Sequence, residues 1–412
     1  MKILHTADIH LGITTYGRID PATGLNTRLQ DFRRAFEFMV EQALAEDVDL
    51  FLFCGDAFRH PDPSPTEQTI FAECLQPLVE RNIPIVLLVG NHDHPVTFGR
   101  ASSIDIFRYL EGQARVFRRP EVATVPTKSG PLQLIALPWP VRSLLLTREA
   151  YRRKSAAEVR EVIEQLYTEY VQKAVEQLDP SLPTVLAGHF SVQGAELSGS
   201  ERTSLIAHEP KFTVGQLALP PIDYVALGHI HRHQNLNPDG IPVVYSSSIE
   251  RVSFREADDP KGFVLVDIQT DGKRKQTRYR FVETPARRFV DLHVDARGNA
   301  DPTESILKAI ARTPVTDAIV RVRYQVDEDQ LGRVDMRRIR KALHSAAHIA
   351  GIERLAGPVV RERRTVIHRD NSLREALTRY IDQHEQLHPL REQLIEAALA
   401  LEARLEAERS PD

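Results

Sequence analysis

The chain has 412 residues, enough for two or three domains of ordinary size. Hydrophobic residues make up 42% and charged residues 27%, which excludes disordered and fibrous classes of protein. The formal net charge of −4 argues against a uniformly basic protein that coats nucleic acid, but it allows a local basic patch. Because the only cysteines are Cys54 and Cys74, disulfide scaffolds and sites built from several thiolates are also excluded.

The start of the chain and its hydropathy bear on location. Residues 1–8 contain neither a long apolar stretch nor the small-residue cleavage site of a secretion signal. No window approaches the roughly 18 consecutive apolar residues of a membrane span. We therefore expect a soluble cytoplasmic protein that does not associate with membranes.

Short apolar runs alternate with amphipathic helices through the first two thirds of the chain. The runs lie at residues 3–7, 50–54, 85–89, 132–137, 184–187 and 224–227. Between them, residues 28–45 and 159–178 place apolar side chains on one helix face. Near-continuous apolar strands separated by helices predict an α/β fold whose sheets are covered on both faces.

The next part of the chain favours strands and then a domain boundary. Residues 243–247 and 262–268 have strand patterns, and Asp271-Gly272 indicates a hairpin turn before a strand at 278–282. The polar, proline-containing stretch 283–288 is a plausible boundary, so the first domain is predicted to span residues 1–285.

Two smaller regions follow this boundary. Strand patterns at 290–294 and 318–326, with helices near 303–312 and 336–347, predict a small α+β domain at residues 286–370. Residues 371–412 are rich in Leu, Ala, Glu and Arg and predict a helical tail. Two helices are expected to meet near His388-Pro389, because proline can start a helix but disrupts its interior.

Polar residues directly follow five of the apolar runs. The segments are Asp8-x-His10, Gly55-Asp56, Gly90-Asn91-His92-Asp93, Gly188-His189 and Gly228-His229-Ile230-His231. One such segment alone is more often a turn or a cap, but strand ends in an α/β sheet converge on a common site. Carboxylate, amide and imidazole donors are suited to divalent manganese, iron or zinc. Two cations about 3.5–4 Å apart, bridged by a carboxylate, would clamp a phosphate ester and activate water.

The order of these segments resembles the calcineurin-like metallophosphoesterase superfamily. Within it, residues 1–12 and the Gly228-His229-Ile230-His231 block with Val243–Ser248 resemble the SbcD-type DNA double-strand-break repair nucleases. This resemblance covers residues 1–285 and implies a metallophosphoesterase β-sandwich flanked by helices. It also implies that residues 286–370 form a capping domain that helps to position DNA, and that residues 371–412 dock on the coiled coil of an SbcC-type ATPase.

Carried over residue by residue, the resemblance implies two metal sites, with Mn²⁺ as the expected cation. The predicted ligands are Asp8, His10, Asp56 and His231 for one cation and Asp56, Asn91, His189 and His229 for the other. His92 would face the phosphate, stabilising the transition state or protonating the leaving oxygen, and Asp93 would orient its ring. Some members of the family have a histidine three residues after the Gly-Asp aspartate, where this sequence has Arg59 with His60 next to it; Arg59 either contacts a phosphate or is solvated, and His60 is given no role.

Other polar residues near these segments have a plainer interpretation. His5 lies inside the first apolar run and is expected to be a hydrogen-bonded core histidine. His94 is interpreted as a loop or substrate-facing residue, because seven donors are already present. Ser246, Ser247 and Ser248 either support the site or end a strand.

A basic patch is predicted where the net charge alone suggested none. Residues 336–364 hold eight basic and two acidic side chains, a local charge of +6. Such a patch suits contacts to DNA phosphates, although a solvated surface explains any single arginine equally well. The candidate DNA contacts are Arg337, Arg338, Arg340, Lys341, Arg361, Arg363 and Arg364.

Two further surfaces are predicted to bind protein. Leu390, Leu394, Leu401 and Leu405 recur at heptad-like spacing in the tail and are candidate contacts for helices of the partner. The alternative is a helical hairpin packed on its own domain. The helix that starts at Pro65 resembles part of the family's dimer interface, so a homodimer is expected.

The sequence therefore favours a two-metal DNA nuclease over two alternatives. We expect an exonuclease on duplex ends and an endonuclease on hairpins, acting with an SbcC-type ATPase in DNA repair and recombination at the nucleoid. A phosphomonoesterase or nucleotidase of the same superfamily is the second interpretation. A binding scaffold without catalysis is the least favoured, because all seven donors and His92 are present.

Overall fold

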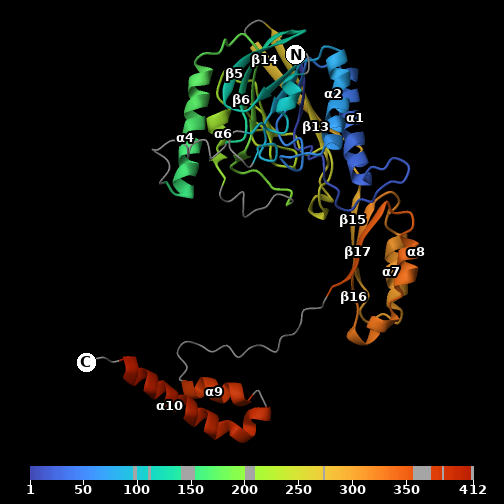
Figure 1. The fold of residues 1–412 in the computed structure, drawn as a ribbon, viewed down its shortest axis with the longest axis vertical. Helices are drawn as coiled ribbons and strands as arrows, with labels where there is room; N and C mark the ends of the chain where they lie inside the picture. The colour runs from blue at the N-terminus through green and yellow to red at the C-terminus, as the bar shows by residue number, and fades with distance from the viewer. Residues whose placement is uncertain are drawn as a thin grey trace. The chain divides into compact units, whose positions relative to one another are not determined.

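A computed structural model describes most of the chain (Figure 1). The described residues are 1–95, 100–109, 113–140, 154–199, 209–271, 274–355, 373–382 and 385–409. They belong to two compact units, Met1–Arg354 and Leu355–Asp412. Within the described residues, the helices are too short or too polar to cross a membrane.

The first unit is built around two six-stranded sheets. The first sheet has the order β14-β13-β1-β2-β3-β4, in which β1 to β4 run parallel and β13 lies antiparallel to β1. Its strands are β1 (Lys2–Thr6), β2 (Leu50–Phe53), β3 (Ile85–Leu88), β4 (Ala114–Phe117), β13 (Gly262–Asp271) and β14 (Arg274–Glu283).

The second sheet has the order β11-β12-β10-β7-β6-β5, with a parallel centre formed by β12, β10, β7 and β6. Its strands are β5 (Glu121–Thr127), β6 (Gly130–Leu137), β7 (Thr184–His189), β10 (Tyr224–Gly228), β11 (Gln234–Asn235) and β12 (Val243–Tyr245). Shorter elements are β8 (Ser191–Val192), β9 (Lys211–Phe212), η1 (Asp105–Tyr109) and η3 (Phe254–Glu256).

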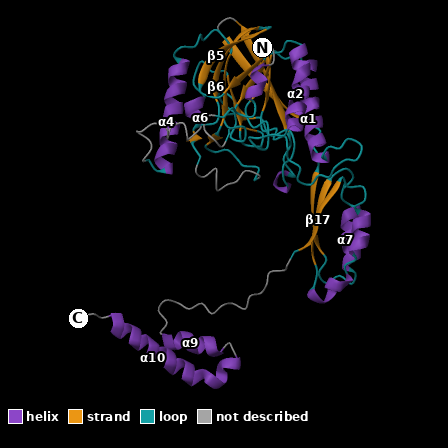
Figure 2. Ribbon diagram, in the orientation of Figure 1, coloured by secondary structure: helices purple, strands orange, loops and turns teal. Residues whose placement is uncertain are grey.

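Helices cover the outer faces of both sheets (Figure 2). An inner core between the sheets joins Leu52 and Val86 of the first to Leu134 and Val185 of the second. The first outer core includes α1 (Thr27–Ala45) and α2 (Pro65–Glu80), and the second includes α4 (Ala156–Val175) and α6 (Val214–Leu217). Because each central strand is buried on both faces, its sequence is almost continuously apolar. The predicted β-sandwich flanked by helices is confirmed.

A third, three-stranded parallel sheet completes the first unit. Its strands are β15 (Phe289–Asp295), β16 (Ile319–Gln325) and β17 (His348–Arg354), and the helices beside it are α7 (Pro302–Ala311) and α8 (Met336–Ala342), with the turn η4 (Glu328–Arg333). The predicted boundary at 285/286 falls in the connector between β14 and β15. The helix predicted to reach residue 347 ends at Ala342, because the chain then joins the sheet through Ala347, whose N–H bonds the Ala318 carbonyl.

The second unit is a pair of helices. These are α9 (Leu373–Asp382) and α10 (Arg391–Arg409), joined through η5 (Glu385–Leu390). Pro389 lies in η5 immediately before α10, as the sequence predicted. Ile381 and Ile395 are buried where α9 and α10 pack together.

Candidate metal centre

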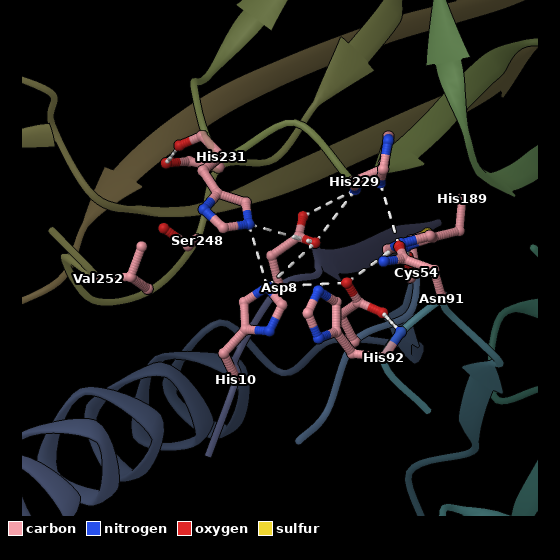
Figure 3. Close-up of polar contacts among 12 residues, drawn as sticks. Asp8, His10, Cys54, Asn91, His92, His189, His229, His231, Ser248 and Val252 are labelled. Atoms are coloured by element: carbon pink, nitrogen blue, oxygen red, sulfur yellow. Dashed lines mark hydrogen bonds and ion pairs between the residues drawn. The ribbon is translucent and has the colours of Figure 1, made fainter. Parts of the chain in front are cut away.

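The five predicted segments meet at the carboxyl ends of strands from both large sheets (Figure 3). Asp8, Asp56 and Asn91 follow β1, β2 and β3 of the first sheet. His189 ends β7 and His229 follows β10, and these two strands are neighbours in which Gly228 pairs with His189. Parallel strands therefore bring donors that lie far apart in the sequence into one cluster, such as His229 and Asp8, which are separated by 221 residues.

The first group of donors contains Asp8, His10 and His231, all buried. His10 Nε2 lies 3.0 Å from His231 Nε2, and Asp8 Oδ1 lies 3.9 Å from each of them. Two ligands at right angles on a cation, with bonds of about 2.1 Å, are about 3.0 Å apart. The spacing of the two ring nitrogens therefore fits one coordination sphere.

The second group contains Asn91, His189 and His229. Asn91 Oδ1 lies 2.9 Å from His189 Nε2 and 3.1 Å from His229 Nδ1. Asp56 Oδ2 is 3.4 Å from His189 Nε2 and 3.7 Å from His10 Nε2 of the first group. One carboxylate oxygen thus faces both groups, which is the position that a bridging ligand requires.

Acceptors behind three of these histidines fix which ring nitrogen faces the site. His189 Nδ1 is 2.6 Å from the Cys54 carbonyl, His229 Nε2 is 2.8 Å from Glu209 Oε2, and His231 Nδ1 is 3.0 Å from Glu256 Oε1. Each acceptor takes the ring N–H, so the opposite nitrogen of the neutral ring offers its lone pair to the site. Sequence reasoning did not identify Glu209 or Glu256, because neither belongs to a motif at a strand end.

The backbone around the donors is unusually close and strained. A Cβ added at Gly90 would lie 2.1 Å from Asp56 Oδ1, and one at Gly228 would lie 2.2 Å from the Cys54 carbonyl oxygen. Asp8, His10 and Asp56 have positive φ angles of 55°, 52° and 64°. Such conformations cost on the order of 1–3 kcal/mol each and persist where the surroundings enforce them. The fold therefore holds these donors together at a cost, as expected for a functional site, and the donor set fits divalent cations.

The buried carboxylates favour positive charge beside them. Burial by itself lowers the pKa of His189, but the neighbouring Asp56 and Asp8 outweigh it and raise the pKa to about 9. Burial likewise opposes ionisation of Asp56, yet His189 and His92 hold its pKa well below the ordinary value. The centre thus stabilises a cation among its carboxylates, which agrees with a metal-binding role.

The structure corrects the predicted relation between Asp93 and His92. Asp93 accepts hydrogen bonds from the backbone N–H groups of Asp56 (2.8 Å), Ala57 (2.9 Å) and Gly90 (3.0 Å), so it fixes the loops around the site. His92 Nδ1 instead lies 2.9 Å from the backbone carbonyl of Arg59. The prediction that Asp93 orients the His92 ring is wrong, and Arg59 supplies that contact through its main chain.

Three residues given a plainer interpretation can also be placed. His5 is fully buried, with its ring nitrogens 3.0 Å from the Tyr224 hydroxyl and 3.2 Å from the Leu227 carbonyl, so the predicted core histidine is confirmed. His94 Nδ1 lies 2.9 Å from the carbonyl of its neighbour Pro95. Ser247 supports the site, because its hydroxyl donates to the carbonyl of His231 at 2.8 Å.

The predicted DNA and partner contacts lie outside this centre. Arg337, Arg338, Arg340 and Lys341 are exposed on α8, and Arg338 pairs with Glu304 at 3.1 Å. Leu390, Leu394 and Leu401 are exposed in the second unit. Four predicted contacts fall outside the described residues or side chains, namely Arg361, Arg363, Arg364 and Leu405.

Comparisons with known proteins agree with this geometry. Residues 1–233, which contain all seven predicted ligands, match the family model for calcineurin-like phosphoesterases. The chain is 30% identical to the SbcD component of nuclease SbcCD from Bacillus subtilis (strain 168) over 288 residues, which are 65% of this chain and 66% of that protein. It is 26% identical to the protein of the same name from Staphylococcus epidermidis over 280 residues, covering 67% and 68% of the two chains.

The chain therefore spans about two thirds of the length of these curated relatives. Among solved structures, a dimetal phosphatase from Danio rerio is similar over 67% of this chain and 98% of that chain, with a TM-score of 0.38 and 9% identity. The family model alone covers more than half of the sequence. The chain belongs to the calcineurin-like phosphoesterase family and is a metal-dependent hydrolase.

Proposed function

We propose that this protein is a two-metal DNA nuclease that uses Mn²⁺. The observation that carries the proposal is the pair of donor groups that share Asp56, with Oδ2 3.4 Å from His189 Nε2 and 3.7 Å from His10 Nε2. The similarity to the SbcD components of nuclease SbcCD supports DNA as the substrate. In this proposal the enzyme degrades duplex ends as an exonuclease and opens hairpins as an endonuclease.

The proposal gives each chemical role to a residue of the candidate metal centre. Asp8, His10 and His231 would hold one cation, Asn91, His189 and His229 would hold the other, and Asp56 would be a ligand of both. When bound, two divalent cations supply Lewis acidity that lowers the pKa of water and neutralises charge on the phosphate. His92 contacts the Arg59 carbonyl through Nδ1, and its Nε2 would face the phosphate, where it would stabilise the transition state or protonate the leaving oxygen.

The assay that tests this function compares two classes of phosphate ester. The full chain is incubated with Mn²⁺ and either end-labelled blunt or hairpin DNA or p-nitrophenyl phosphate. We expect cleavage of both DNA substrates, and its loss when EDTA removes the metal. An Asp56→Asn variant, which weakens the bridge between the two groups, serves as the matched control. Hydrolysis of the small ester with intact DNA would contradict the proposal and favour a phosphomonoesterase.

We also propose that the exposed basic residues of α8 contact DNA phosphates. Neutralising Arg337, Arg340 and Lys341 to glutamine should weaken DNA binding at all sequences. It should also reduce the steepness of the slope of log K, the association constant, against the logarithm of the salt concentration by about 3, because each phosphate contact contributes about 0.9 to that slope. The measurement is fluorescence anisotropy over a salt series. A triple variant of the exposed Arg115, Lys128 and Arg278 provides the control, and equal slopes for the two triple variants would refute these contacts.

The proposed assembly contains a homodimer and an SbcC-type ATPase at the nucleoid of the cytoplasm. The dimer would use α2, whose start at Pro65 is fixed by a capping box between Ser64 and Glu67. Light scattering of the purified chain tests the dimer, and a monomeric mass at all concentrations would exclude it. The exposed leucines of the second unit would contact the ATPase.

A further inference from the structure

A buried carboxylate stands directly behind one of the proposed metal ligands. Glu256 is 0% exposed and ends the turn η3, with Oε1 3.0 Å from His231 Nδ1. Its other oxygen, Oε2, lies 3.0 Å from Nζ of the buried Lys261, which also donates to the His231 carbonyl at 3.0 Å. A buried charge is costly unless it is paired, so the pair formed by Glu256 and Lys261 is held in one geometry. Glu256 contacts the His231 ring, and Lys261 contacts the His231 backbone.

The same turn also contacts the third sheet. The ring of Phe254 lies 5.0 Å from that of Phe289 on β15 and 5.2 Å from that of Tyr16, edge to face in both cases. The guanidinium carbon of Arg321 on β16 lies 4.2 Å from the centre of the Phe254 ring, within the range of a cation–π contact. Phe254, two residues before Glu256, is therefore packed against two strands of that sheet.

Arg251 makes a second connection along the same segment. Its Nε donates to the Glu256 carbonyl at 3.2 Å, and its Nη1 donates to the carbonyl of Arg287 at 3.2 Å. Arg287 lies in the connector that leads from β14 into β15. The turn Arg251–Glu256, which contains η3, thus contacts the metal centre through Glu256, the third sheet through Phe254 and the connector through Arg251.

We propose that Glu256 is a positioning residue of the metal centre and that the turn Arg251–Glu256 couples the third sheet to the cation held by Asp8, His10 and His231. This inference rests on the proposed ligand role of His231. Glu256 keeps the proton on Nδ1 and so presents the Nε2 lone pair to the cation. Phe254, packed on the third sheet, and Arg251, bonded to the connector that leads into it, hold Glu256 in place. Coupling free energies are reciprocal, so displacement of the third sheet changes the affinity of that cation, and binding of the cation favours one position of the sheet.

Calorimetric titration of the full chain with Mn²⁺ tests both parts of this proposal. Glu256→Gln should weaken one of two binding events by about 10- to 100-fold, the range for partners behind metal ligands, and leave the other unchanged. Arg321→Ala should weaken the same event although Arg321 contacts no ligand. Its matched control is Arg323→Ala, because both arginines pair with Asp291 but only Arg321 lies over Phe254.

A double variant tests whether Arg321→Ala weakens Mn²⁺ binding by acting through Glu256. If it does, Arg321→Ala will not weaken binding further in the Glu256→Gln background. Wild-type affinity in Glu256→Gln, or equal effects of Arg321→Ala and Arg323→Ala, would overturn the inference. If the wild-type chain binds Mn²⁺ but leaves DNA intact, the nuclease proposal fails and this inference stands. If the wild-type chain binds no Mn²⁺, both are wrong.

Discussion

Replacement of His92 by alanine is expected to lower DNA cleavage by about 100- to 10,000-fold, the usual contribution of a general acid or base, while both cations stay bound. The backbone N–H of His92 donates to Asp56 Oδ1 at 2.8 Å, a contact that survives loss of the side chain. The ring uses Nδ1 toward the Arg59 carbonyl and packs edge to face on His10, with centroids 4.8 Å apart. In the proposed mechanism its Nε2 would face the phosphate.

The measurement pairs a cleavage assay with metal analysis of the same preparation. His10, Asp56 and His92 also form a group whose donor atoms are close enough to hold a cation, so the metal content is the decisive quantity. We expect two Mn²⁺ per chain in both the wild type and the His92→Ala variant. His388→Ala, which removes an exposed imidazole from the second unit, is the control and should keep the wild-type rate. Loss of one metal in His92→Ala would show that His92 is a ligand.

Polar substitution of the exposed leucines in α10 should abolish binding of the proposed SbcC-type ATPase. Leu394 is 36% exposed and Leu401 is 58% exposed, whereas Ile395 and Ile381 are buried between α9 and α10. The helix pair therefore has its own small core, and the leucines lie outside it. Exposed apolar side chains gathered on one helix face are typical of a protein-binding surface.

Co-purification with the ATPase provides the measurement for this prediction. The double variant Leu394→Asp/Leu401→Asp should fail to co-purify with the ATPase. In the absence of the ATPase, the Mn²⁺-dependent hydrolysis of DNA by this variant should equal that of the wild type. Glu396→Gln, an exposed polar change on the same helix, is the matched control and should bind normally. Retention of the complex by the leucine variant would indicate that these side chains serve another purpose.

The first unit illustrates how far local sequence pattern determines a fold. The apolar runs predicted the central strands because these strands are buried on both faces and leave little choice of side chain. Strand β17 (His348–Arg354) was not predicted, since most of its residues are only partly buried and their sequence has no clear alternation. Edge and surface strands take their structure from pairing with neighbours, and the sequence of the strand alone carries a weak signal for it.

The five polar segments were identified from the sequence because each follows an apolar strand and parallel strand ends converge, and the family resemblance then implied which seven of their residues are ligands. The sequence by itself thus predicted the central strands and the candidate donor segments, and its resemblance to the family implied the sandwich and the role of each donor. Only the tertiary structure decided how the rings are held, since His92 contacts the main-chain carbonyl of Arg59, and Glu209 and Glu256 reach His229 and His231 from separate segments of the chain. The physical reason is that a buried strand requires apolar side chains along its own sequence, whereas contacts between segments far apart in the sequence depend on how the whole chain packs.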